Sequence, residues 1–328
     1  MNTPRNILII RFSSIGDIVL CTAGIRCLYK TFSGVQIDVL CSKQFHTVLQ
    51  SNPYISKIIY PQTSWSSTLI ELKQKQYDLV IDWQSNLKSR VIAFYLNTKT
   101  IRFNKINFKK WLAVRFKEIS LLPKKHIVQR YFESLKSIQV NYDEKGLDFF
   151  INPTDRIDIS KIFSIDVPYA VLVLGGSYFT KRIPETKIKQ ILTHLPVPVI
   201  LIGGKESLPL MKSLKDFSPK QISYTAHLNI HQSASVIQQS QWVFTSDTGM
   251  MHIAAAFKKI IFSFWGNTLP EFGMAPFEPH PDNLIFEVLN LDCRPCSKLG
   301  FHKCPRGHFK CMNDINLSPL NTIRFNQQ

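Results

Sequence analysis

The sequence predicts an α/β protein made of two doubly wound halves that face each other. Three observations lead to this fold class. Short, almost continuous apolar runs recur along the chain, which is typical of parallel strands covered on both faces. Amphipathic stretches of helical length separate these runs, so strands and helices alternate. The alternation restarts after the polar, proline-containing stretch at 151–160, which has the composition of a linker.

The expected elements follow the same order in both halves. The first half has a helix expected at 18–32 and strands at 6–12, 36–42, 57–61 and 77–83. The second half has strands expected at 169–177, 197–205, 242–247 and 260–266. A chain of 328 residues suits two domains of ordinary size. We therefore expect one Rossmann-like domain at 1–160 and another at 161–328.

Composition excludes several other classes of protein. The 45% hydrophobic and 19% charged content is that of a globular chain rather than a disordered one. No segment approaches the roughly 20 apolar residues that span a bilayer. In the N-terminal run MNTPRNILIIRF an arginine ends the apolar stretch too early for a signal peptide, so we expect a cytoplasmic protein. Seven cysteines in a reducing compartment argue against a disulfide framework.

The net charge of +17 is unevenly spread and suggests an anionic partner. Residues 1–165 carry 24 Lys and Arg against 12 Asp and Glu. Within them, the stretch 99–126 has nine Lys or Arg and one Glu, interleaved with four aromatics: Phe103, Phe108, Trp111 and Phe116. This mixture suits an acidic membrane surface or a phosphorylated glycolipid. The alternative is a solvated helix face whose aromatics lie in the core.

Four polar or glycine-bearing turns follow predicted strands, where doubly wound sheets bind ligands. They lie at 13–17, 175–177, 203–206 and 246–249. Each turn alone is explained by helix capping, because Gly, Ser and Asp are the usual residues there. Four turns at equivalent places in the topology predict a site between the two halves.

The turn at 246–249 has the features of a phosphate site. Asp247, Thr248 and Gly249 are expected at a helix N-terminus, where unpaired N–H groups and the helix dipole favour an anion. His252 lies four residues after Thr248 on the same side and can donate to a phosphate oxygen. The alternative is that Asp247 only caps the helix and His252 packs beneath the sheet. In another turn, Lys181 lies in the loop before a proline-initiated helix, where it can neutralise a diphosphate without a metal ion; the alternative is a solvated surface lysine.

Together these residues resemble glycosyltransferase family 9, the ADP-heptose:lipopolysaccharide heptosyltransferases. The resemblance rests on ILIIRFSSIGDIVLCTAGIRCLYKTF, YDLVIDWQSNLKSR, GGSYFTKRIPE and SDTGMMHIAAA, and it runs in order from about residue 6 to about 315. It implies a GT-B fold with the acceptor on the N-terminal domain and the nucleotide-sugar on the C-terminal one. It also implies inverting sugar transfer without a divalent metal, so no cofactor is expected for catalysis. The turn LGGS and Ile183 depart from the family's usual residues.

The resemblance also assigns roles to individual positions. Asp17 matches the proposed catalytic base. The donor-binding positions are Ser177, Lys181, Glu206, Asp247, Thr248, Gly249 and His252, and the acceptor-side positions are Ser14, Gly16, Asp82 and Gln84. The implied partners are a nucleotide-sugar donor similar to ADP-heptose and an anionic glycolipid of the lipopolysaccharide-core type. The protein would then act in the cytoplasm, at the inner face of the inner membrane.

Asp17 suits general base catalysis on physical grounds as well. In an inverting displacement the acceptor hydroxyl attacks the anomeric carbon while the diphosphate leaves, and a nearby carboxylate accepts the hydroxyl proton. Partial burial would raise the pKa of Asp17, and the surrounding basic residues would oppose that rise. The alternative makes Asp17 the N-cap of a helix that begins at Ile18.

Four C-terminal cysteines form a candidate structural zinc site: Cys293, Cys296, Cys304 and Cys311. A C-x-x-C pair followed by two further thiols supplies the ligands of a tetrahedral site, although the second pair departs from zinc-ribbon spacing. His302 and His308 are spare ligands. The alternative is a set of reduced packing cysteines or a redox-sensitive pair.

Two other functions compete with glycosyl transfer. The charge alone is compatible with a nucleic-acid-binding protein, but the chain contains no RNP-type aromatic motif, zinc-finger spacing or basic recognition helix. A related nucleotide-sugar enzyme such as an epimerase would share the fold. It would process its donor without any acceptor.

Overall fold

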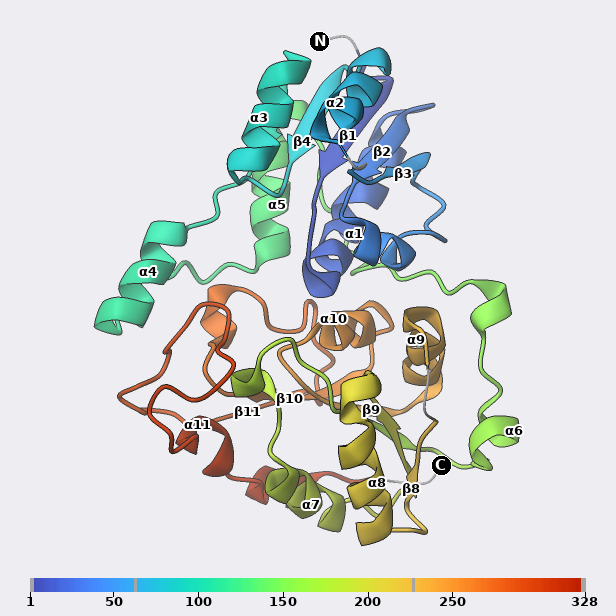
Figure 1. The fold of residues 1–328 in the computed structure, drawn as a ribbon, viewed down its shortest axis with the longest axis vertical. Coiled ribbons are helices and arrows are strands. Elements are labelled where there is room, and N and C mark those ends of the chain that lie inside the picture. Colours follow the sequence, from blue (N-terminus) through green and yellow to red (C-terminus); the bar gives the residue numbers. More distant parts are fainter. Residues whose placement is uncertain (1–2, 62–63, 226–227, 326–328) are drawn as a thin grey trace. The chain divides into compact units, whose positions relative to one another are not determined.

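The computed structural model describes residues 3–61, 64–225 and 228–325, and it contains two compact units (Figure 1). The first unit is formed by Met1–Lys105 and Lys125–Phe150, and the second by Ile106–Lys124 and Ile151–Gln328. Each unit has its own parallel sheet with helices on both faces. The fold class predicted from the sequence, α/β with two doubly wound sheets, is confirmed.

The first unit is built on a five-stranded parallel sheet in the order β3-β2-β1-β4-β5. Its strands are β1 (Asn6–Ile10), β2 (Gln36–Leu40), β3 (Lys57–Ile59), β4 (Leu79–Asp82) and β5 (Thr100–Arg102). Helices α1 (Ile15–Thr31) and α5 (Ile127–Leu135) pack together on one face, and α2 (Trp65–Gln74) and α3 (Leu87–Leu96) on the other. Apolar side chains of β1, β2 and β4 bury against α2 and α3, which is the largest favourable contribution to such a fold.

The second unit has six parallel strands in the order β11-β10-β9-β6-β7-β8. They are β6 (Ala170–Val173), β7 (Val199–Ile202), β8 (Ile222–Ser223), β9 (Trp242–Ser246), β10 (Ile260–Trp265) and β11 (Leu284–Glu287). Helices α7 (Glu185–Thr193), α8 (Leu208–Phe217) and α11 (Lys310–Asn313) share one hydrophobic core with the sheet. Helices α9 (Ile230–Gln239) and α10 (Gly249–Ala256) pack against each other on the other face, and α6 (Ile159–Phe163) follows the linker.

All eight predicted strands are present, each shorter than expected. Three further strands, β5, β8 and β11, were not predicted; each has only two to four residues. The first helix begins at Ile15, three residues earlier than expected. Its first turn is therefore made from the SSIGD motif itself.

The second unit takes one segment from within the first. Residues 106–124 contain α4 (Asn107–Phe116) and group with the second unit, and the later boundary falls after Phe150 instead of after residue 160. The physical reason is a small hydrophobic cluster that joins this segment to the chain after β10. Its members are Ala113, Leu122, Leu269 and Phe272.

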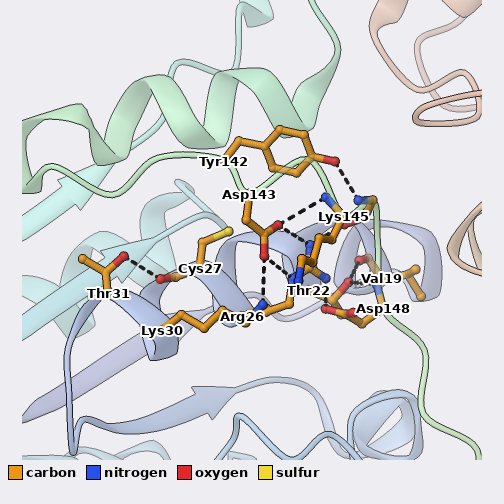
Figure 2. A network of polar contacts seen from close by, with 11 residues as sticks. Val19, Thr22, Arg26, Cys27, Lys30, Thr31, Tyr142, Asp143, Lys145 and Asp148 are labelled. Atoms are coloured by element: carbon orange, nitrogen blue, oxygen red, sulfur yellow. Dashed lines mark hydrogen bonds and ion pairs between the residues drawn. The ribbon is translucent and has the colours of Figure 1, made fainter.

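A buried arginine holds the end of the first unit against α1 (Figure 2). Arg26 donates to both carboxylate oxygens of Asp143 at 3.0 and 2.8 Å, pairs with Asp148, and donates to the Gly146 carbonyl at 2.8 Å. Lys30, one turn later, pairs with Asp143 at 3.1 Å. These contacts fasten the segment that leads to the linker onto the helix that begins beside Asp17.

In the part of the chain that the structure describes, no helix is both long and apolar enough to cross a membrane.

Candidate active site

The predicted site residues of the first unit lie where its strand order reverses. β1 and β4 are neighbours in the sheet although they are distant in sequence. In doubly wound sheets this switch point leaves a crevice at the carboxyl ends of the strands, where ligands bind. The turn after β1 carries Ser14, Gly16 and Asp17, and the turn after β4 carries Gln84.

Asp17 lies in the first turn of α1 and holds that turn together. Ser14 is the N-cap, and its backbone N–H and its hydroxyl both donate to Asp17 Oδ2 at 3.0 Å. Asp17 is thus the third residue of a capping box, with its side chain 22% exposed, and the expected alternative of an N-cap before Ile18 is wrong. Gly16 is buried in the same turn, and Ser14 is exposed.

Arg11 is a site residue that the sequence analysis missed. Its guanidinium forms an ion pair with Asp17 Oδ1 and donates to the carbonyls of Trp83, at 2.6 Å, and Ser13, at 3.0 Å. Burial disfavours the charged guanidinium, but the Asp17 carboxylate outweighs this cost and raises the pKa of Arg11 above its usual value. The signal was the arginine that directly follows the first apolar strand, which indicates a buried cation needing a partner.

Asp82 and Gln84 complete the edge of the sheet. Asp82 is fully buried, and it accepts from the Ser85 N–H at 2.6 Å, the Ser89 hydroxyl at 2.9 Å and Arg102 Nε at 3.2 Å. Gln84 Oε1 accepts from the Phe12 N–H at 3.0 Å and joins the β1 and β4 turns. Both side chains therefore shape the turns around Asp17.

The second unit has its switch point between β6 and β9, and two predicted residues meet there. Lys181 Nζ lies 2.6 Å from Asp247 Oδ2, although the two residues are 66 positions apart. The hydroxyl of Thr268, in the turn after β10, donates to the same oxygen at 3.0 Å. The sequence analysis missed Thr268 because its turn carries no Gly-Ser or Asp cluster. A cation and a carboxylate are thus held together at the carboxyl edge of the sheet.

Helix α10 starts directly after this pair. Gly249 is its first residue and Thr248 its N-cap, and Thr248 makes no side-chain hydrogen bond to the helix. The Thr248 hydroxyl lies 3.1 Å from that of Thr245 instead. The Thr248 side chain therefore leaves the N–H groups of the first turn uncapped, which suits an anion. His252 lies on the same helix and is only 2% exposed, so its position is also compatible with the packing alternative.

Ser177 and Glu206 belong to the neighbouring turns. Ser177 follows β6 and Glu206 follows β7, and both are exposed. A Cβ on Gly204 would stand 2.3 Å from a carboxylate oxygen of Glu206, so the Glu206 side chain folds back over its own turn. Because β9, β6 and β7 are adjacent, these turns lie along one edge of the sheet with the Lys181–Asp247 pair.

The four C-terminal cysteines do not form the zinc site that the sequence suggested. Among the residues that the structure describes, no group of three or more His, Cys, Asp or Glu side chains could hold a metal ion. Cys311 is buried in the core of the second unit, and Cys304 packs against that core. Cys293 Sγ lies 3.9 Å from His308 Nε2. Burial, and after it the neighbouring Cys296, Cys304 and Cys293 thiols, raise the pKa of Cys311, so the four thiols lie near one another without forming a set of metal ligands.

The aromatic side chains of the basic stretch differ in exposure. Phe103 is buried and contacts the Tyr131 ring edge-on at 4.8 Å, as the packing alternative requires. On α4, by contrast, Phe108, Trp111 and Phe116 are at least half exposed. Phe108 and Trp111 stack at 5.9 Å, and Trp111 contacts Phe116 edge-on at 5.7 Å. Helix α4 therefore presents an aromatic surface with basic residues around it.

Comparisons with known proteins agree with this architecture. The family model for glycosyltransferase family 9 (heptosyltransferase) matches residues 66–300. The chain is 22% identical to lipopolysaccharide heptosyltransferase 1 of Pseudomonas aeruginosa, over 98% of this chain and 95% of that protein. It is also 22% identical to lipooligosaccharide heptosyltransferase 2 of Haemophilus influenzae, over 81% and 85%.

Two solved structures share the fold. A glycosyl transferase family 9 protein from Veillonella parvula superposes with a TM-score of 0.71 at 17% identity and covers 88% of both chains. The ADP-heptose lps heptosyltransferase II of E. coli gives a TM-score of 0.66 at 16% identity and covers 94% of this chain and 98% of that one. The two-sheet architecture is that of the GT-B fold.

Proposed function

The chain belongs to glycosyltransferase family 9, and from this premise we propose that it transfers heptose from an ADP-heptose-like donor to a glycolipid acceptor of the lipopolysaccharide-core type. The similarity to lipopolysaccharide and lipooligosaccharide heptosyltransferases supports this choice of donor and acceptor. The observation that carries the proposal in the structure is the Lys181–Asp247 pair beside the start of α10. This arrangement offers a cation and uncapped N–H groups to a diphosphate.

Asp17 is proposed as the general base. The acceptor hydroxyl attacks the anomeric carbon, the bond to the diphosphate breaks, and the hydroxyl proton passes to the carboxylate, so the anomeric configuration is inverted. Each carboxylate oxygen can accept more than one hydrogen bond, so the contacts with Ser14 and Arg11 leave room for a hydroxyl donor. Arg11 would orient the carboxylate and stabilise its charge.

The leaving diphosphate needs positive charge, which the second unit can supply. Lys181 contributes a full charge and the N-terminus of α10 a partial one, near Thr248 and Gly249. These groups would act in place of a divalent metal. Asp247 would bind the sugar, Ser177 a phosphate and Glu206 the nucleoside. His252, a buried residue of α10, would donate a hydrogen bond to a phosphate oxygen.

The acceptor side is proposed for the switch point of the first unit. Ser14 and Gly16 belong to the turn that carries Asp17. Asp82 and Gln84 would act mainly by fixing the two turns, because their oxygens already accept hydrogen bonds from the chain. A nucleic acid is not a proposed partner.

The glycolipid acceptor implies contact with a membrane, and α4 is proposed as one point of contact. Its exposed Phe108, Trp111 and Phe116 suit the bilayer interface, and the neighbouring Lys and Arg side chains suit acidic headgroups. The enzyme would then work at the inner face of the inner membrane. The protein should sediment with acidic vesicles at low salt and be released at high salt. Equal sedimentation with neutral vesicles would contradict this contact.

Product analysis tests the function itself. The protein is incubated with a panel of nucleotide-sugars, first alone and then with a heptose-free lipopolysaccharide-core acceptor. We expect ADP-heptose to give the largest thermal stabilisation, because a bound ligand stabilises the folded state by mass action. We also expect transfer only when the acceptor is present. Donor epimerisation or complete donor hydrolysis without acceptor would favour the epimerase-like alternative.

A further inference from the structure

Helix α3 has large apolar side chains on both of its faces. Its inner side chains, Ile92, Ala93 and Leu96, belong to the core of the first unit. On the outer side Leu87 is 79% exposed and Phe94 88% exposed, and Val91 and Tyr95 are also exposed. A contiguous exposed patch of large apolar side chains normally marks a contact surface. The outer side of α3 therefore calls for a partner.

The outer apolar residues form a continuous stripe. Leu87, Val91, Phe94 and Tyr95 stand at positions i, i+4, i+7 and i+8, so they share one side of the helix. Lys88 and Arg90 are exposed on the same helix, which contains no acidic residue. We call these six residues the α3 face.

Two lysines connect the α3 face with the neighbouring helix α2. Lys88 Nζ lies 5.5 Å from the centre of the half-exposed Trp65 ring, and Lys73 Nζ lies 5.9 Å from that of Tyr95. Lys73 also donates to the Leu96 carbonyl at 3.0 Å, which ties it to the end of α3. The exposed apolar side chains thus have lysines fixed beside them. This combination suits a bilayer interface, where apolar acyl chains lie beneath anionic headgroups.

We propose that the α3 face binds the interface of an anionic lipid bilayer. Leu87, Val91 and Phe94 would enter the acyl boundary while Lys88 and Arg90 pair with phosphate headgroups. A second copy of the chain fits less well, because a symmetric contact brings the same patch of each copy together. It would therefore set the two cationic rims against each other. The inference rests on the membrane-bound acceptor proposed above.

Vesicle binding by the full-length protein tests the α3 face. Sedimentation is measured with vesicles of phosphatidylcholine alone and with phosphatidylglycerol added, for wild type, Leu87→Ser/Phe94→Ser and Lys88→Glu/Arg90→Glu. The matched control is Phe217→Ser, because Phe217 is an exposed aromatic on α8 of the second unit. We expect both α3 variants to bind the acidic vesicles at least roughly tenfold more weakly. The first loses apolar side chains that would be buried in the bilayer, and the second replaces two cations near the anionic headgroups by carboxylates. The control should bind as wild type does.

Other results would overturn the proposal. Wild-type affinity of both α3 variants would show that lipid does not contact this face. If sedimentation velocity shows that the wild type self-associates and the α3 variants do not, while vesicle binding is unchanged, the α3 face binds a second copy of the chain. Transfer to a delipidated core oligosaccharide separates this inference from the proposed function. The rate of this transfer should be the same in the α3 variants as in the wild type. If the wild type shows no transfer, the result counts against the proposed function and not against lipid binding by the α3 face.

A separate observation concerns Arg294, which lies within the C-x-x-C motif. Its buried guanidinium donates to the Gly266 carbonyl at 2.7 Å and the Thr268 carbonyl at 2.9 Å, and it pairs with Glu287 at 2.5 Å. The turn at 266–268 is therefore fastened at both of its ends. Thr268 is the residue whose hydroxyl contacts Asp247.

The segment after Arg294 also contacts the chain beside Lys181. The Phe301 N–H donates to the Thr180 hydroxyl at 2.8 Å, and the Thr180 N–H donates to the Phe301 carbonyl at 3.2 Å. A Cβ on Gly266 would stand 2.7 Å from the Thr180 carbonyl oxygen, so only glycine allows the two turns to approach this closely. Both partners of Asp247 are thus attached to one C-terminal segment.

We infer that Arg294 is a positioning residue for Asp247, acting through Thr268. This inference also rests on the proposed donor site. Hydrogen exchange of the 247–252 region is compared in wild type, Thr268→Val, Arg294→Met and the double variant. Arg156→Met serves as a matched control, since Arg156 is an exposed arginine of the second unit. Exchange should rise in the first two variants, with no further rise in the double variant, because residues in one network are not additive.

Nucleotide binding gives a second readout, with ADP as the probe. Thr268 shares the Asp247 carboxylate oxygen with Lys181, the cation proposed for the diphosphate. We therefore expect Thr268→Val to keep its melting temperature and to bind ADP several-fold more weakly, because Lys181 is then less well positioned. Arg294→Met should add little to Thr268→Val. Additive effects in the two assays, or a lower melting temperature with unchanged exchange at 247–252, would overturn the inference. If wild type binds no ADP, the proposed donor is wrong and hydrogen exchange still decides the role of Arg294.

Discussion

Lys181 Nζ lies 2.6 Å from Asp247 Oδ2, so the cation expected to contact a diphosphate is held by the carboxylate expected near the sugar. Replacing Lys181 by Met removes the cation and leaves Asp247 with Thr268. We expect at least about tenfold weaker ADP binding, since hydrogen bonds to charged groups contribute about 1.5–3 kcal/mol. Isothermal titration calorimetry measures the ADP affinity of both proteins. Lys189→Met, at a partly exposed ion pair on α7, should bind ADP as wild type does.

Replacing Asp17 by Asn tests the general base. Asparagine can still accept a hydrogen bond from the Ser14 N–H, but it cannot accept a proton, and it loses the ion pair with Arg11. We expect donor affinity to be kept and turnover to fall at least ~100-fold, measured as initial rates. Asp78→Asn is the control, because Asp78 accepts backbone hydrogen bonds at the opposite end of β1. Near-normal turnover of the Asp17 variant would make its carboxylate structural.

Replacing Arg26 by Met should destabilise the first unit strongly. The substitution leaves Asp143 and Asp148 without their buried partner, and breaking a buried ion pair typically costs about 3–5 kcal/mol. Urea unfolding measures the change. Lys30→Met is the control: its side chain is 42% exposed, and such pairs contribute about 0–1 kcal/mol. Equal effects of the two substitutions would show that the Arg26 network does not act as a unit.

The same network gives the first unit a pH dependence. Burial opposes ionisation of Asp143, but Arg26 and Lys30 outweigh it and hold the pKa of Asp143 below its usual range. A depressed carboxyl pKa stabilises the folded state above the unfolded value of about 3.9, and the contribution is lost as the pH falls further. Burial raises the pKa of Asp148, which acts in the opposite sense.

The difference between wild type and Asp143→Asn isolates the contribution of Asp143. Urea unfolding of both proteins between pH 7 and pH 3 should show a difference that is constant at neutral pH and shrinks as the pH falls below about 4. A difference that grows toward low pH would show that the carboxylate is not stabilised in the folded protein.

The cysteines should differ in their reactivity toward iodoacetamide. Burial raises the pKa of the Cys21 and Cys311 thiols to about 12, and only the thiolate reacts. Cys293 and Cys304 are partly exposed. At pH 8 we expect these two to be alkylated first, as mass spectrometry of timed samples would show. Protection of both thiols that is relieved by a chelator would bring back the structural zinc hypothesis.

The sequence was sufficient for eight of the strands that the structure describes, because each is a nearly continuous apolar run, and polar turns mark both switch points. The sequence does not predict contacts between residues that are far apart along the chain, and some site residues are recognised by such contacts. The place of Arg11 directly after the first strand is visible in the sequence, but its contact with the Trp83 carbonyl, 72 positions away, is not. Thr268 is identified only by its contact with Asp247. The composition of the basic stretch at 99–126 is visible in the sequence, but the packing of Ala113 with Leu269 is not.

That packing also imposes an order on synthesis. Ala113 and Leu269 are 156 positions apart, so a ribosome adding about 5–20 residues per second completes α4 roughly 8–30 s before its packing partners exist. During this interval the nascent chain carries Trp111 and its aromatic neighbours without the rest of the second unit. The first unit, by contrast, has all of its sheet and helices by residue 150. Helix α4 is therefore covered only when residues 269–272, which are translated much later, have been added.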